Sequence, residues 1–152
     1  MVDTTAFESF MTANYEAYSW EQLDATTDDD YVLSLFHVWD PEHVTDDLPP
    51  VLFQHGQLMN ALTWFKDFGE DGEDSSSLFT NFAALGHHVY IGNTRGTEFS
   101  MRHNGLDYQD SIDAENYWNF TYQDMYKDTI ANGEAIMANY SGTEKSIYIG
   151  NE

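Results

Sequence analysis

Runs of β-forming residues alternate with segments of helical periodicity along most of this chain, and this order restricts the fold more than any other feature. Residues 31–38 are rich in aromatic and branched side chains, and residues 51–56 and 87–92 are short apolar runs that end in glycine. These three runs predict strands. Residues 78–85 and 122–140 carry apolar side chains at helical spacing. Strands that alternate with helices predict an α/β fold with a mostly parallel sheet and right-handed crossovers.

Two more strands complete this order. Residues 23–27 precede the acidic turn Asp28–Asp30, so they are expected to form an N-terminal antiparallel hairpin with the strand that follows the turn. Residues 146–149 form the last predicted strand. We therefore assign residues 18–152 to one domain and residues 1–17 to an N-terminal extension.

The charge of the chain excludes one large class of partners. The sequence holds 27 acidic and five basic residues, a formal net charge of −22. Without a cluster of Lys and Arg to neutralise phosphates, we expect no binding to nucleic acid and little attraction to anionic lipid surfaces. There is no cysteine, which excludes disulfides and thiolate zinc sites. No apolar run approaches the roughly 18 residues of a transmembrane helix, and the N-terminus lacks the features of a secretory signal, so the compartment stays open.

Four short strings together carry a family resemblance. Thr27–Leu33 is similar to T-x-D-G-Y-I-L, but has Asp at the glycine position, and Phe53–Leu58 is similar to F-L-Q-H-G-L-L. Tyr90–Gly96 is similar to W-x-G-N-S/N-R-G, and Tyr117–Met125 is similar to F-W-x-F-S-Y-D-E-M. They occur in family order at family-like spacing. On these strings the chain resembles the acid-lipase family of α/β-hydrolases, the gastric and lysosomal type, over roughly residues 18–150.

The resemblance implies the N-terminal half of an α/β-hydrolase fold, truncated at the nucleophile elbow. It also implies hydrolysis of lipid carboxylic esters, triacylglycerols or sterol esters, through a serine acyl-enzyme. Members of this family are often secreted or lysosomal. The lipid ester would be the substrate of the chain once a C-terminal half completes it.

The segment His55-Gly56-Gln57 is the first candidate site. It follows a buried strand, and Gly56 permits a close backbone approach that can aim the Gln57 N–H into a cleft. An acyl-transfer enzyme needs such a donor where negative charge develops on the carbonyl oxygen. In the family the residue after His-Gly supplies this oxyanion-hole donor, a role that maps to Gln57. In the alternative interpretation His55 is a buried loop anchor and Gln57 is a surface residue.

A second loop, Gly92–Gly96, matches neither of the glycine-rich phosphate motifs. We interpret it as structural. Arg95 is one of few cations in a very acidic chain, so it is expected to fix the loop by pairing with carboxylates or carbonyls. Asn93 and Gly96 are assigned to the same structural loop, as are His55 and Gly56 of the first.

The sequence predicts no metal site and no cofactor. His87 and His88 are neighbours in a predicted strand, so they point to opposite faces and do not share an ion easily. The acidic stretch of residues 69–77 lacks the spacing of a calcium loop. His103 precedes any elbow, whereas the catalytic histidine of these hydrolases comes last in the chain, so it is not the base.

The nucleophile is the feature that departs from the family. In these hydrolases the strand at residues 146–149 leads into Gly-x-Ser-x-Gly, but Glu152 stands at the serine position. We expect Glu152 to be inactive and the chain to be a catalytically incomplete fragment. The alternative is a non-catalytic remnant that binds a protein partner or a hydrophobic ligand. In either case an exposed sheet edge is expected to favour self-association.

Overall fold

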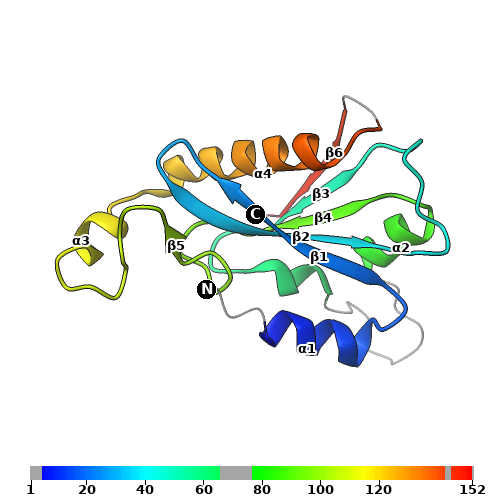
Figure 1. Cartoon of the computed structure of the whole chain (residues 1–152), viewed down its shortest axis with the longest axis horizontal. Coiled ribbons are helices and arrows are strands. Elements are labelled where there is room, and N and C mark those ends of the chain that lie inside the picture. The colour runs from blue at the N-terminus through cyan, green and yellow to red at the C-terminus, as the bar shows by residue number, and fades with distance from the viewer. Residues whose placement is uncertain (1–4, 66–76, 143–144, 152) are drawn as a thin grey trace.

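The computed structural model describes residues 5–65, 77–142 and 145–151, and it places helices on both faces of a central sheet (Figure 1). One face is covered by α1, by the 3₁₀ segment η1 and by α2, and the other face by α4. The helical elements are α1 (Thr5–Asn14), η1 (Ala61–Phe65), α2 (Leu78–Ala84), α3 (Ala114–Tyr117), η2 (Tyr122–Met125) and α4 (Tyr126–Asn139).

The sheet has the strand order β1-β2-β4-β3-β6, and β5 adds to β2 outside this path. The strands are β1 (Ser19–Thr26), β2 (Tyr31–Trp39), β3 (Val51–Gln54), β4 (Val89–Gly92), β5 (Arg102–His103) and β6 (Ile147–Gly150). The pairs β4–β3 and β3–β6 are parallel, and β2 is antiparallel to β1, β4 and β5. The prediction of a mostly parallel sheet therefore describes only the β4–β3–β6 half. A parallel pair needs a crossover, and residues 40–50 carry no helix, so the chain returns antiparallel after β2.

Strand β2 is buried on both sides, and its alternation defines the two faces of the sheet. Phe36 and Val38 pack with α1 and α2, in a cluster that also holds Phe7 of α1. Leu35 points the other way and packs with Ile136 of α4. Because side chains alternate along a strand, His37 shares the α4 face with Leu35.

The β1–β2 hairpin confirms the predicted antiparallel pairing and turns at residues 27–30. The Thr27 N–H donates to the Tyr31 carbonyl at 2.9 Å, and the Asp30 N–H donates to the Thr27 carbonyl at 3.1 Å. Asp30 has a φ of 70°, the left-handed conformation that favours glycine. The turn thus keeps a glycine-type backbone with an aspartate in it.

None of the helices in the described ranges combines the length and the apolar character that crossing a bilayer requires.

Candidate functional site

Two loops meet at the carboxyl ends of β3 and β4, which are neighbouring parallel strands. In open α/β sheets, ligands bind at this edge. The first loop begins at His55 and the second at Asn93. The structure therefore brings the two predicted loops together.

His55 joins the loops through both of its ring nitrogens. The Thr94 N–H donates to His55 Nε2 at 3.2 Å, so Nδ1 carries the ring proton and donates to the Gly56 carbonyl at 2.8 Å. His55 is buried, and burial lowers its pKa, an effect that the Gly56 carbonyl only partly opposes. A neutral His55 with both nitrogens engaged is a loop anchor.

Gln57 lies in an exposed turn beside a cavity of about 240 Å³. Leu58, the next residue, is fully exposed and has a φ of 59°. A left-handed leucine costs about 1–2 kcal/mol and persists only where the surroundings impose it. The cavity is lined by the His-Gly-Gln segment, by the second loop and by residues from β3, η2, α4 and β6. The lining residues are Gln54, His55, Gly56, Gln57, Thr94, Met125, Tyr126, Thr129 and Tyr148.

Asn93 fixes the start of the second loop from the interior. Its side chain is fully buried. The amide Nδ2 donates to the Ser34 carbonyl of β2 at 2.9 Å, and Oδ1 accepts from the Ala61 N–H of η1 at 3.0 Å. Asn93 thereby ties the loop to the sheet and to the helical segment that follows the first loop.

Arg95 is fully buried and is held by two carboxylates. Its Nε donates to Asp128 Oδ1 at 2.8 Å, and its backbone N–H donates to Asp128 Oδ2 at 2.8 Å. The two terminal nitrogens reach the oxygens of Asp29 at 2.8 and 3.0 Å. The guanidinium also lies 4.1 Å from the ring centre of Tyr31. This network ties the second loop to α4 and to the hairpin turn.

Sequence reasoning did not find either carboxylate. Asp128 lies one helical turn after Asp124, near the start of a helix. An acidic residue there is usually exposed and favoured by the helix dipole, so the sequence gives no sign that Asp128 is buried. Asp29 sits in a run of three aspartates. Its burial acts to raise its pKa, but hydrogen bonds from Arg95 and Thr27 outweigh this effect and hold the pKa well below the usual range.

Gly96 has a φ of 73°, and a Cβ at this position would lie 2.8 Å from the Trp118 ring and 3.1 Å from the Phe120 ring. Both the backbone and the packing therefore require glycine here.

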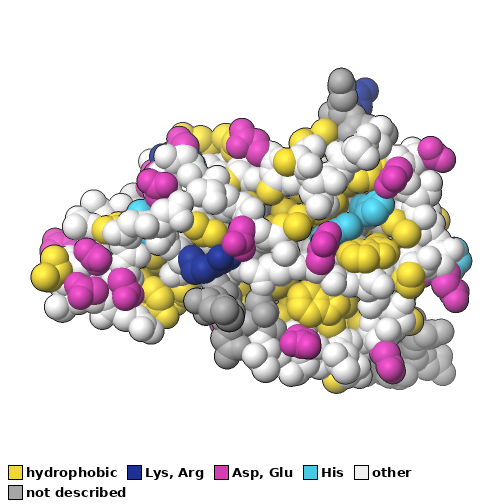
Figure 2. Space-filling model, in the orientation of Figure 1, with side chains coloured by type: hydrophobic (Ala, Val, Ile, Leu, Met, Phe, Trp, Pro, Cys, Tyr) yellow, Lys and Arg dark blue, Asp and Glu magenta, His cyan; other side chains and the backbone are white. Residues whose placement is uncertain are grey.

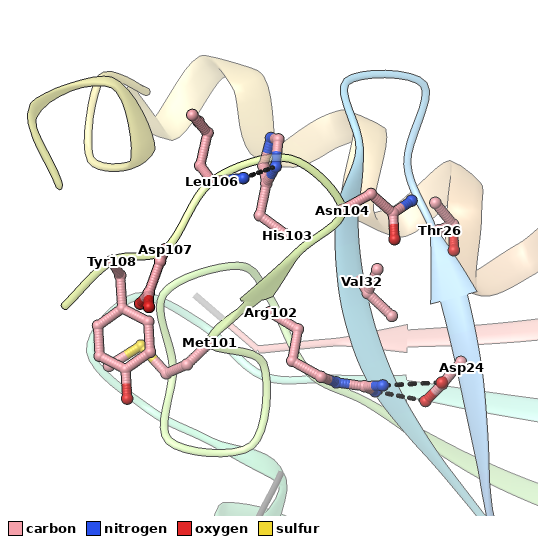
Figure 3. A pocket seen from close by; sticks show the side chains of 10 residues that line it. All are labelled: Asp24, Thr26, Val32, Met101, Arg102, His103, Asn104, Leu106, Asp107 and Tyr108. Carbon is pink, nitrogen blue, oxygen red and sulfur yellow. Dashed lines mark hydrogen bonds and ion pairs between the residues drawn. The ribbon is translucent and has the colours of Figure 1, made fainter. Parts of the chain in front are cut away.

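A second cavity, of about 420 Å³, shares no lining residue with the first (Figure 3). Arg102 and Asp24 form a two-pronged ion pair on its wall. His103 Nδ1 accepts from the Gly105 and Leu106 N–H groups at 2.9 and 3.1 Å. His103 thus holds its own loop in place and lines a cavity separate from that of His55.

Two sequence interpretations fall on residues whose placement is not described. They are Glu152, at the serine position, and nearly all of the acidic stretch 69–77. Within the described ranges, no three His, Asp or Glu side chains converge as they would around a metal ion.

The mixed sheet, with helices on both faces, is that of an α/β-hydrolase fold. An esterase of Pyrococcus furiosus has the same fold, with a TM-score of 0.57 at 15% identity over 88% of this chain and 40% of that one. Residues 11–67 match the region described as partial alpha/beta-hydrolase lipase region. The predicted fold class is confirmed.

The human protein lipase member M is 29% identical over 94% of this chain, and human lysosomal acid lipase/cholesteryl ester hydrolase is 29% identical over 90%. These matches confirm the resemblance of the chain to the N-terminal part of the acid-lipase family of α/β-hydrolases. The chain covers 33% of the length of each of these two relatives.

Proposed function

We propose that this chain forms the oxyanion side of the active site of a lipid ester hydrolase, with the Gln57 N–H as one donor. One observation supports this most directly: His55 ties the Gly56 carbonyl, just before Gln57, to the Thr94 N–H of the second loop, beside a cavity at the carboxyl edge of the sheet. The strained backbone of Leu58 supports it further, because such strain is characteristic of functional turns.

The substrate class in this proposal is a lipid carboxylic ester. The relatives that name their substrates are a cholesteryl ester hydrolase and a triacylglycerol lipase. Turnover also needs a serine nucleophile with an acid and a histidine, and no Gly-x-Ser-x-Gly occurs in these 152 residues. We therefore propose that residues 1–152 alone position a substrate carbonyl without cleaving the ester.

Two experiments test the proposal. The first is hydrolysis of a short-chain chromogenic ester by residues 1–152 beside the Glu152→Ala variant, where we expect no activity in either. Activity that the variant loses would mean that Glu152 takes part in the chemistry and would contradict the proposed division of roles.

The second experiment grafts this chain onto human lysosomal acid lipase in place of the matching third. In the folded chimera, Gln57→Pro removes the N–H and should lower kcat by about 10²–10³-fold, whereas Gln57→Ala keeps the N–H and should retain kcat within a few-fold. Full activity of the proline variant, or a folded but inactive chimera, would contradict the role of Gln57.

A non-catalytic binding role is the second candidate, and the outer face of α4 favours it. Tyr126, Ile130 and Met137 are 61%, 52% and 40% exposed and share one helix face. Retention of a fatty acid or of a protein partner by the chain, lost on Ile130→Glu with folding unchanged, would support this alternative.

A further inference from the structure

Four titratable side chains form a continuous hydrogen-bonded chain at the opposite end of the sheet from His55. Glu21 Oε1 lies 2.9 Å from His37 Nδ1, and His37 Nε2 lies 2.8 Å from His88 Nδ1. His88 Nε2 lies 3.1 Å from Asp46 Oδ1. The order is carboxylate, imidazole, imidazole, carboxylate.

The strand register builds this chain. Glu21 of β1 pairs directly with His37 of β2, and His88 immediately precedes β4, the next strand of the sheet. Asp46 comes from the loop of residues 40–50. The imidazoles are mostly buried, with 7% and 17% of their side chains exposed, and the carboxylates reach solvent. Figure 2 shows histidine side chains between acidic ones on this face.

The tyrosines packed around the imidazoles carry no charge near neutral pH. Tyr90 of β4 stacks on His37 at 4.3 Å, and burial raises the pKa of Tyr90, so it stays neutral. The Tyr140 ring, just after α4, lies 5.2 Å from His88. Burial and the charges of Asp46 and Asp47 raise the pKa of Tyr140 as well. The adjacent His87 contacts the Pro49 carbonyl instead.

Counting protons shows what this geometry can hold. Each of the three contacts needs one N–H, so three ring protons fill all of them. With two ring protons, one contact joins two lone pairs. With four, two N–H groups face each other between the imidazoles, and two positive charges meet.

We propose that Glu21, His37, His88 and Asp46 form a pH-sensitive latch that holds residues 40–50 against the sheet while the imidazoles share three ring protons, and that loosens when they carry four. The latch acts on a segment that is also held by the Thr45 N–H, which donates to the Gly86 carbonyl at 2.9 Å. The proposed latch does not depend on ester hydrolysis by this chain.

The direction of the pH effect follows from His37. Burial lowers the pKa of His37, the Glu21 contact opposes this, and the charge of His88 adds to it, with a net lowering. An unfolded histidine has a pKa of about 6.5, so below this pH the unfolded chain binds a proton that the folded one excludes. On the acid side, the stability from the latch is therefore lost as the pH falls below about 6.5. At higher pH, loss of the third ring proton leaves one contact between two lone pairs, so the latch holds best over an intermediate pH range.

Urea unfolding of the whole chain between pH 7.5 and 5 tests the latch with two matched variants. His88→Asn keeps an amide that can rotate to present either an N–H or an oxygen to His37, so it removes the conflict. His43→Asn changes an exposed histidine of the same loop that pairs with Asp40. As the pH falls, the folding constant of the wild type and of His43→Asn should drop by up to about tenfold more per pH unit than that of His88→Asn.

Hydrogen exchange of the Thr45 amide reads the loop itself. The protection of this amide in the wild type, divided by its protection in His88→Asn at the same pH, should exceed one at pH 7 and approach one at pH 5. Equal pH profiles of the wild type and His88→Asn would overturn the proposal. If His88→Asn does not fold, imidazole ¹⁵N spectra of the wild type decide: coupling between His37 Nε2 and His88 Nδ1 supports the latch, and independent titration of the two rings overturns it.

Discussion

At the scale of single residues, Asp30 shows a conflict between a side chain and its backbone. The position has a left-handed φ of 70° and corresponds to a glycine of the family string. Aspartate adopts left-handed φ values more readily than most residues, but its Cβ still makes this conformation unfavourable. The side chain is exposed and makes one long contact, 3.4 Å from Asn104 Nδ2. The side chain of Asp30 therefore does little to stabilise this backbone conformation.

We expect Asp30→Gly to stabilise the chain by about 0.5–1 kcal/mol, because relief of left-handed strain (about 1–2 kcal/mol) exceeds the backbone entropy that glycine loses (about 0.5–1 kcal/mol). Urea unfolding measures the change. Asp30→Asn is the control, since it removes the charge and keeps the Cβ. An equal gain from both variants would mean that charge, and not backbone strain, is the cause.

At the scale of elements, the buried ion pair of Arg95 decides how the second loop sits on α4. Asp128 is fully buried and binds both the side chain and the backbone of Arg95. Arg95 also lies one residue after Thr94, whose N–H contacts His55. Arg95 and Thr94 therefore link α4 to the His55 loop.

Asp128→Asn should destabilise the chain by about 3 kcal/mol, because a buried guanidinium loses one of its two carboxylates. Unfolding by urea at pH 7 measures the loss. Glu134→Gln removes an exposed carboxylate from the same helix, so its effect should stay within about 0.5 kcal/mol. A similar small loss from Asp128→Asn would show that Asp29 alone satisfies Arg95.

Local patterns were enough to predict β2, β3, β4, β6 and α2, because each is an apolar or periodic run bounded by turn residues. The partners of Arg95 were not predictable in this way, since they depend on how α4 packs on the sheet. The contact between Glu21 and His37 could have been predicted from the sequence. A hairpin that turns at residues 27–30 fixes this register, but the sequence interpretation started β1 too late, at residue 23.

At the scale of the whole molecule, two forces oppose each other at the edge of the sheet. In the described sheet β6 lies at one end of the strand order, beside β3. Tyr148 on this edge is 54% exposed. An edge strand offers backbone groups to a second chain, whereas a net charge of −22 repels it.

Ionic strength sets which force wins. The screening length falls from about 30 Å at 0.01 M salt to about 8 Å at 0.15 M. Sedimentation of residues 1–152 should therefore show a monomer at low salt and concentration-dependent association at higher salt.

Tyr148→Lys separates the two forces, because a lysine on an edge strand discourages pairing while it lowers the net negative charge. If the β6 edge carries the association, this variant stays monomeric at salt concentrations where the wild type associates. If general charge repulsion alone controls association, the variant associates at lower salt than the wild type, and the role of the edge is contradicted. NaCl and KCl should act alike, because screening depends on ionic strength.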